Sequence, residues 1–235
     1  FVLLSKLTTS GSSTNQKQKD SYPKLQSQLL ALVQEIKHNN ETFSDPTDYS
    51  DVRVTITSCV FRSCFSYEIE YHRGGALFFV FSASTITKTL FDNCHAFQGG
   101  AIEASVSQMT ITNTNFTNNE AADAGGAVIL FQCANFKITG GFSMYNDANY
   151  HGCFCVHESN GTIESHNFIS NAAEIDCACV SICESQAKIE RCYFVLNEAN
   201  FYPGALQIEE GEGKLITSCI INNCYFWIIY TFVIN

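Results

Sequence analysis

Residues 99–121 have the sequence GGAIEASVSQMTITNTNFTNNEA, which contains one complete copy of a repeat. The copy begins with a small-residue step at Gly99–Ile102 and continues through the alternating run Met109–Thr112. It ends with an aromatic step of the form Phe-x-x-Asn-x-Ala, which starts at Phe116. Alternating apolar and polar residues are typical of a half-buried β-strand. The stretch therefore predicts a unit of short strands joined by tight turns, with no room for a helix.

Both steps recur along most of the chain. Small steps begin at Gly74, Gly99 and Gly125, and the aromatic anchors at positions 61, 91, 116, 142, 168, 194 and 220 are 30, 25, 26, 26, 26 and 26 residues apart. A unit of this length without a helix buries its apolar face only by stacking on its neighbours. Because parallel crossovers are almost always right-handed, we predict an all-β, right-handed parallel β-helix of about seven coils over residues 50–224.

Equivalent residues of successive coils should lie above one another at the strand spacing of about 4.8 Å. We expect the anchor Phe side chains to form a single inward column, and the Asn side chains to hydrogen-bond along the axis as an amide ladder. The predicted ladder residues are Phe61, Phe91, Phe116, Phe142, Phe168, Phe194, Asn119, Asn171 and Asn197. The architecture depends on Phe116, Phe142, Phe168 and Phe194 lying in one file.

The two ends of the chain differ from the repeats. Residues 23–37 place Pro in a first turn and apolar residues along one face, which predicts a helix. It is interpreted as an N-terminal cap within residues 21–40, or alternatively as a partner-binding helix. Residues 1–20 are expected to be disordered or to be the remainder of a leader segment. Residues 225–235 form either an apolar last strand or the start of a truncated membrane span, because a complete span needs about 20 residues.

The alternation of GGA(I/L/V) with FxxN resembles the repeat of the polymorphic outer membrane protein (Pmp) family. The resemblance covers residues 52–223, and departs from the pattern where His151–Phe154 and Asp176–Cys179 replace two small steps. It implies a right-handed β-helix of the pectin-lyase-like class, displayed at a cell surface or secreted. Bacterial members of the family are adhesins, and related repeats occur in surface proteins of protists.

Two functions are compatible with these features. A net charge of −10 disfavours nucleic acid and anionic membrane surfaces as partners, because both require a basic face. The first hypothesis is a non-enzymatic surface or secreted protein, without a cofactor, that binds an extracellular protein or glycan. Attachment to a membrane through a C-terminal span beyond this chain is compatible with this hypothesis. The alternative is a polysaccharide lyase or glycoside hydrolase of the same fold.

The first coil contains extra residues near 65–73, and an extended loop on a regular stack is a common place for recognition. The candidate binding residues there are Tyr67, Tyr71, His72 and Arg73, although a plain tolerated insertion is the alternative. No catalytic residue is predicted. Glu164 and Glu190 lie one coil apart, but their strand positions alternate outward and favour solvated surface charges.

Twelve cysteines allow three interpretations. The pairs Cys153/Cys155 and Cys177/Cys179 are about one coil apart and could bind Zn²⁺ through four thiolates. Neighbouring coils also bring Cα atoms within disulfide range. As a third possibility, stacked cysteines serve as small buried apolar residues. The sequence leaves these alternatives open, with metal binding the weakest of them.

Overall fold

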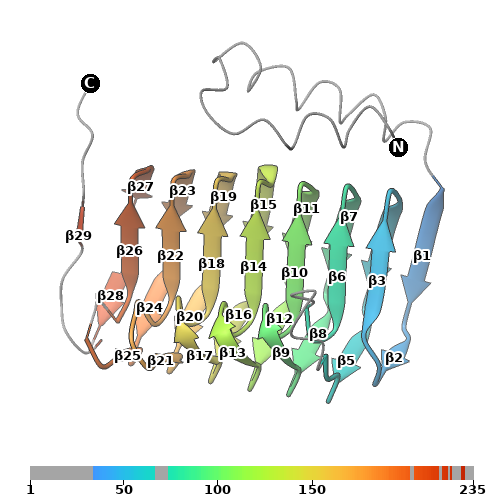
Figure 1. The fold of residues 1–235 in the computed structure, drawn as a ribbon, viewed down its shortest axis with the longest axis horizontal. Coiled ribbons are helices and arrows are strands. Elements are labelled where there is room, and N and C mark those ends of the chain that lie inside the picture. The colour runs from blue at the N-terminus through green and yellow to red at the C-terminus, as the bar shows by residue number, and fades with distance from the viewer. Residues whose placement is uncertain are drawn as a thin grey trace, which may run out of the picture. The chain divides into compact units, whose positions relative to one another are not determined.

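The computed structural model describes residues 34–66, 74–201, 204–216, 219–221, 223 and 229–230. Within these ranges the chain is a parallel β-solenoid of about six turns, with no helix. Equivalent strands of successive turns lie side by side along one axis (Figure 1). The predicted all-β parallel solenoid is therefore confirmed.

Three faces of the solenoid are parallel sheets of eight strands, and a fourth sheet has five. Sheet A consists of β1 (Glu35–Asn39), β4 (Arg53–Thr57), β7 (Ala83–Thr87), β11 (Gln108–Thr112), β15 (Ala134–Thr139), β19 (Asn160–Glu164), β23 (Gln186–Glu190) and β27 (Glu212–Ile216). Sheet B consists of β2 (Thr42–Phe43), β5 (Val60–Arg62), β8 (Leu90–Asp92), β12 (Asn115–Thr117), β16 (Phe142–Met144), β20 (Asn167–Ile169), β24 (Tyr193–Val195) and β28 (Cys219–Ile221).

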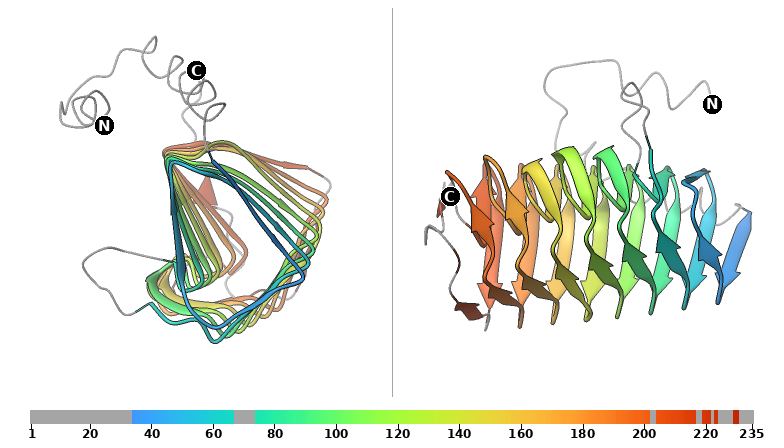
Figure 2. Two further views of the ribbon diagram at one scale, coloured as in Figure 1. Left: turned by 90° about the vertical axis from the view of Figure 1, so that its right-hand side faces the viewer. Right: turned by 90° about the horizontal axis from the view of Figure 1, so that it is seen from below.

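Sheet C consists of β3 (Thr47–Ser50), β6 (Leu77–Val80), β10 (Ile102–Ser105), β14 (Val128–Phe131), β18 (Phe154–His157), β22 (Val180–Cys183), β26 (Leu206–Glu209) and β29 (Ile229–Tyr230). Sheet D consists of β9 (His95–Gln98), β13 (Glu120–Ala124), β17 (Asp147–Tyr150), β21 (Ala172–Ala173) and β25 (Glu198–Ala199). The chain passes through the sheets in the order A, B, D, C in each of the central turns. The view along the axis shows how these faces enclose the core (Figure 2, left).

Strand alternation builds the core. In sheet A the middle residue of each Thr-Ile-Thr run points inward, and Ile56, Ile86 and Ile111 are completely buried in register with one another. The corners between sheets use single residues in the left-handed region, which the small-residue step supplies at Gly99 (φ 59°) and Gly125 (φ 67°). The Gly-Gly steps therefore form corners.

The aromatic column runs along the inside of sheet B. Phe61 stacks on Phe91 with ring centroids 4.8 Å apart, and Phe91 stacks on Phe116 at 5.2 Å. Further along, Phe168 stacks on Phe194 at 5.0 Å with the rings within 8° of parallel. All five rings are completely buried.

The prediction that Phe142 belongs to this column is wrong. Phe116 and Phe168 both pair with Ser143, whereas Phe142 pairs with Asn167 and is only half-buried. The corner at Gly140–Gly141 contains one extra residue, and both glycines have positive φ. The spacings from Phe116 to Ser143 and from Ser143 to Phe168 are therefore 27 and 25 residues, which together equal two regular repeats of 26. For this reason the shift was not apparent from the anchor positions.

His166, together with the ring of Phe154, fills the space that an aromatic ring at position 143 would occupy. The ring of His166 is completely buried and lies 4.9 Å from the ring of Phe168 and 6.5 Å from that of Phe116. The Nδ1–H group donates to the carbonyl of Gly140 at 2.8 Å, so Nε2 accepts the hydroxyl of Ser143 at 2.8 Å. Burial lowers the pKa of His166 to about 4, and the ring is therefore neutral at neutral pH.

The amide ladder lies beside the aromatic column. Each side-chain amide donates one hydrogen to the next Asn Oδ1 and one to a backbone carbonyl of the preceding coil. The Oδ1–Nδ2 distances from Asn119 to Asn146, Asn171 and Asn197 in turn are 2.8, 2.9 and 3.0 Å. The ladder also includes Asn146. The sequence did not predict this residue, because the repeat was aligned on Phe142.

The N-terminal end of the solenoid also differs from the prediction. Glu35–Asn39 forms strand β1, in which Ile36 pairs with Val54 of β4, so the helix predicted for residues 23–37 does not extend through these positions. Pairing with β4 satisfies the backbone of β1 and places Ile36 on the core, which outweighs the helical spacing of the apolar residues. The solenoid starts at β1 rather than at residue 50. The rest of the predicted cap, and residues 1–20, lie outside the described residues.

Ser143 stands where other coils have Phe, and His166 stands where other coils have Thr. We therefore expect the effects of substitutions at these two positions on stability to be strongly coupled. Thr114 and Thr89 hold the position of His166 two and three coils earlier. Ser143→Phe alone should collide with His166, and His166→Thr alone should leave a void, each costing about 2–4 kcal/mol of unfolding free energy. The double variant should recover at least about 2 kcal/mol in urea unfolding. If the double variant lost as much unfolding free energy as the two single variants combined, this packing would be contradicted.

Candidate functional site

Buried polar atoms without a hydrogen-bond partner are concentrated on one face. In the described part of the chain they are Glu103 Oε2, Thr139 Oγ1, His151 Nδ1, His157 Nδ1, Asp176 Oδ1 and Gln207 Oε1. All except Thr139 lie on the outer face of sheet C or in the turns that lead into it. Such atoms mark places where water, an ion or a ligand completes the hydrogen bonding. We name Glu103, His151, His157, Asp176 and Gln207 the C-face polar row.

One outward column of sheet C is buried over five successive coils, from Glu103 to Gln207. The column contains, coil by coil, Asp48, Phe78, Glu103, Ile129, Cys155, Ser181 and Gln207. Along it, Glu103 is 6% exposed and Gln207 only 1% exposed. The end of sheet D lies against this face, where Ala124 packs on Ile129 and Cys155. The result is a sheltered strip that runs parallel to the solenoid axis.

Glu103 is the most perturbed carboxyl group on this strip. Burial, together with the nearby charge of Asp48, raises the pKa of Glu103 to about 8. At neutral pH the group therefore keeps its proton and can donate a hydrogen bond as well as accept one. Its Oε2 atom has no partner within the described residues.

The turns from sheet D to sheet C add polar side chains along the same strip. His151 Nδ1 lies 3.4 Å from Asp176 Oδ2, close enough for an ion pair but without the alignment of a hydrogen bond. In the neighbouring coils Gln98 Nε2 donates to Asp123 Oδ2 at 2.6 Å. The turns thus present carboxylate, imidazole and amide groups beside the outward column.

A second outward column on sheet C contains a stacked pair of rings. The ring of Phe131 stacks on that of His157 with centroids 5.4 Å apart and planes within 12°. Glu158 and Glu184 each place a carboxylate oxygen 3.8 Å from a ring nitrogen of His157. An aromatic surface with an acidic border therefore adjoins the C-face polar row.

The four cysteines considered for zinc do not share one site. Cys153 and Cys179 belong to the inward small-residue column, whereas Cys155 points to the outer face and packs against Ala124. Cys177 lies in a turn, where its thiol donates to the carbonyl of Val180. Among the described residues no three His, Cys, Asp or Glu side chains are arranged to hold a metal ion. All ten cysteines that the structure describes are buried free thiols.

The other predicted site residues have mixed outcomes. Tyr67, Tyr71, His72 and Arg73 lie outside the described residues, so the loop hypothesis stays a prediction. Glu164 and Glu190 pair in adjacent strands and both contact Arg191, in agreement with surface charges.

The C-face polar row was not predicted from the sequence. Alternation places Glu103 and Gln207 outward, which normally indicates exposure to solvent. Their burial depends on the turn from sheet D folding over the face, and no residue pattern within the strands indicates this. The sequence offered one signal for this row. Asp176 lies one coil from His151, and both residues stand at steps that depart from Gly-Gly-Ala.

Comparison of the chain with protein-family models, with curated proteins and with solved structures finds no match. Among the described residues, no helix has the length and apolar character needed to cross a membrane. The functional argument therefore rests on the geometry of the solenoid itself.

The raised pKa of Glu103 predicts a pH-dependent stability. The folded state holds this proton between the unfolded pKa of 4.5 and the folded value of about 8, so unfolding free energy falls as pH rises through that range. Glu103→Gln should remove the fall and stabilise the protein at about pH 8 by on the order of 2–4 kcal/mol. Urea unfolding at several pH values measures this effect, with the exposed Glu198→Gln as control. Parallel pH profiles for the wild type and Glu103→Gln would refute it.

Proposed function

We propose that this protein is a non-enzymatic cell-surface or secreted binding protein, a right-handed β-helix of about seven Pmp-type coils that holds a neutral glycan along the outer face of sheet C. The observation that carries the proposal is the concentration of unpartnered buried polar atoms in the C-face polar row. The Pmp-like steps of the sequence support the surface location.

A glycan suits the hydrogen-bonding groups of this face. Sugar hydroxyls both donate and accept, so one ligand class can satisfy the oxygen of Gln207, the protonated carboxyl of Glu103 and the imidazole of His157. The stacked rings of Phe131 and His157 add apolar ring edges beside these polar groups. Because the groups lie in columns along the axis, the ligand should be an extended chain.

The charge of the face selects among glycans. Asp123, Asp176, Glu158 and Glu184 border the strip, and the whole chain has a net charge of −10. An anionic polysaccharide would be repelled by these carboxylates. A neutral oligosaccharide is therefore the favoured ligand.

Binding of neutral oligosaccharides tests the proposal. Calorimetry with neutral oligosaccharides of glucose, mannose and N-acetylglucosamine, and with sulfated oligosaccharides of equal length, should show binding of a neutral chain alone. Gln207→Leu should weaken that binding roughly 5–30-fold, because a hydrogen bond of about 1–2 kcal/mol is lost. Thr85→Ala, an exposed change on sheet A, is the matched control. Equal loss in both variants, or binding of sulfated chains only, would sink the proposal.

One observation favours hydrolysis of a glycan as a second candidate function. Asp48 and Glu103 lie in the same column on either side of Phe78, two strand spacings or roughly 9–10 Å apart. Inverting glycosidases place a protonated acid and a carboxylate base about 6.5–9.5 Å apart across the bond they cleave. Glu103, with its raised pKa, fits the acid, and Asp48 would serve as the base.

This second candidate predicts release of reducing ends from a bound neutral glycan. Glu103→Gln and Asp48→Asn should each lower the rate by a factor of about 100 or more, since each removes a proton-transfer group. Thr85→Ala should leave the rate unchanged. A glycan that binds tightly and stays intact over long incubation would eliminate hydrolysis and leave the binding function standing.

A further inference from the structure

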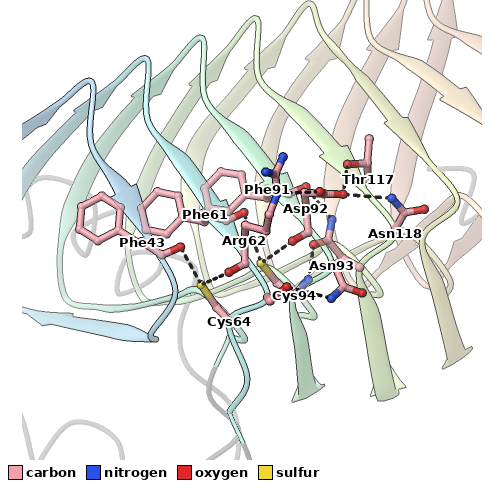
Figure 3. A network of polar contacts seen from close by, with 12 residues as sticks. Phe43, Phe61, Arg62, Cys64, Phe91, Asp92, Asn93, Cys94, Thr117 and Asn118 are labelled. Carbon is pink, nitrogen blue, oxygen red and sulfur yellow. Dashed lines mark hydrogen bonds and ion pairs between the residues drawn. The ribbon is translucent and has the colours of Figure 1, made fainter.

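The amide ladder has two cysteines at its N-terminal end. Cys64 and Cys94 occupy the position three residues after the Phe anchor that Asn119 and later Asn residues hold in the following coils. Each thiol contacts the same kind of backbone carbonyl as the ladder amides. Cys94 Sγ lies 3.8 Å from the oxygen of Phe61, and Cys64 Sγ lies 3.7 Å from that of Phe43 (Figure 3).

The two thiols lie next to each other in adjacent coils. They are held between two paired positions, Arg62 with Asp92 and Phe65 with His95, so their backbones are one strand spacing or about 4.8 Å apart. Disulfides join Cα atoms about 4.4–6.8 Å apart. The closeness of the two thiols lowers the pKa of Cys64 and raises that of Cys94. Both side chains are completely buried.

A second pair of stacked cysteines lacks this arrangement. Cys153 and Cys179 also hold equivalent positions in adjacent coils. Burial, however, raises the pKa of both Cys153 and Cys179. Within the described residues, a lowered thiol pKa distinguishes Cys64 from both members of that pair.

We propose that Cys64 and Cys94 form a disulfide that covalently joins the first two rungs of the ladder when the chain folds in an oxidising compartment. With a small disulfide such as oxidised glutathione as oxidant, the Cys64 thiolate attacks one sulfur and releases one glutathione thiolate. Cys94 then loses its proton and attacks Cys64 in the mixed disulfide, which releases the second glutathione. Two protein thiols are oxidised and one glutathione disulfide is reduced to two thiols.

The bond would anchor the base of the longest insertion in the repeat. Cys64 directly precedes the insertion near residues 65–73, and Gly74 follows it. The covalent loop between the two cysteines thus contains the whole insertion with Tyr67, Tyr71, His72 and Arg73. Because both thiols are buried in the folded chain, oxidation should precede closure of these coils.

Peptide mapping of the wild-type chain tests the pairing. The protein is refolded with reduced and oxidised glutathione, its remaining thiols are alkylated, and it is cut with trypsin and a glutamate-specific protease. Cleavage after Arg62, Glu68, Lys88 and Glu103 isolates each cysteine in its own peptide, residues 63–68 and 89–103. Mass spectrometry should detect these two peptides joined, with two hydrogens fewer than their sum, and separated by reduction. Recovery of both as alkylated monomers, or joined to other cysteines, overturns the proposal.

A thermal measurement gives a second readout. The oxidised wild type should melt roughly 5–10 °C above the reduced protein, as expected for a disulfide that closes a loop of about 30 residues. Cys64→Ser should abolish this difference, whereas Cys153→Ser, at the second stacked pair, should retain it. A redox-dependent shift that survives in Cys64→Ser would assign the effect to another pair. Peptide mapping keeps the proposal testable if either variant fails to fold.

Discussion

In-register hydrogen bonding between successive coils is the constraint on which the rest of the structure depends. Every strand in sheets A, B and C pairs in parallel with the equivalent strand one turn away. A side chain in one coil is therefore covered by its counterpart in the next, and chemical identity at equivalent positions becomes a packing requirement. The stacked rings at Phe61 and Phe91, and the amides of Asn171 and Asn197, are consequences of this pairing. Side-chain amides suit this pairing because each can donate a hydrogen bond to one neighbouring coil and accept one from the other.

The register is robust to local irregularity. The extra residue at Gly140–Gly141 moves Phe142 out of the core, yet the strands on either side keep their pairing. The correction is made within one coil, by Ser143 and by the ring of His166. The same tolerance explains how sheet C keeps its ladder across the insertion between Phe65 and Gly74, where β3 pairs directly with β6.

Much of the fold could be predicted because the repeat spacing reports the pairing directly. Stacking of Phe91 and Phe116 follows from the repeat spacing and strand alternation, and Phe61 stacks on Phe91 because the extra residues of its coil lie near residues 65–73. The placement of Phe142 could not be predicted, because an insertion of one residue and a deletion of one cancel over two repeats. Strand β1 was mistaken for a helix because a single copy of a degenerate coil contains too few residues to show its period. The C-face polar row depends on how a turn folds over a sheet, which is a tertiary property absent from the strand pattern.

The neutral ring of His166 gives this solenoid a point of weakness at its middle. Its folded pKa is about 4 and its unfolded value 6.5, so the stabilisation it provides is present above 6.5 and is lost as the medium acidifies towards 4. In a repeat protein each coil is held only by its two neighbours, and damage to one coil separates the array into independent halves. Acidification would thus open the stack from its centre, between the turns of Ser143 and Phe168, instead of fraying it from the ends.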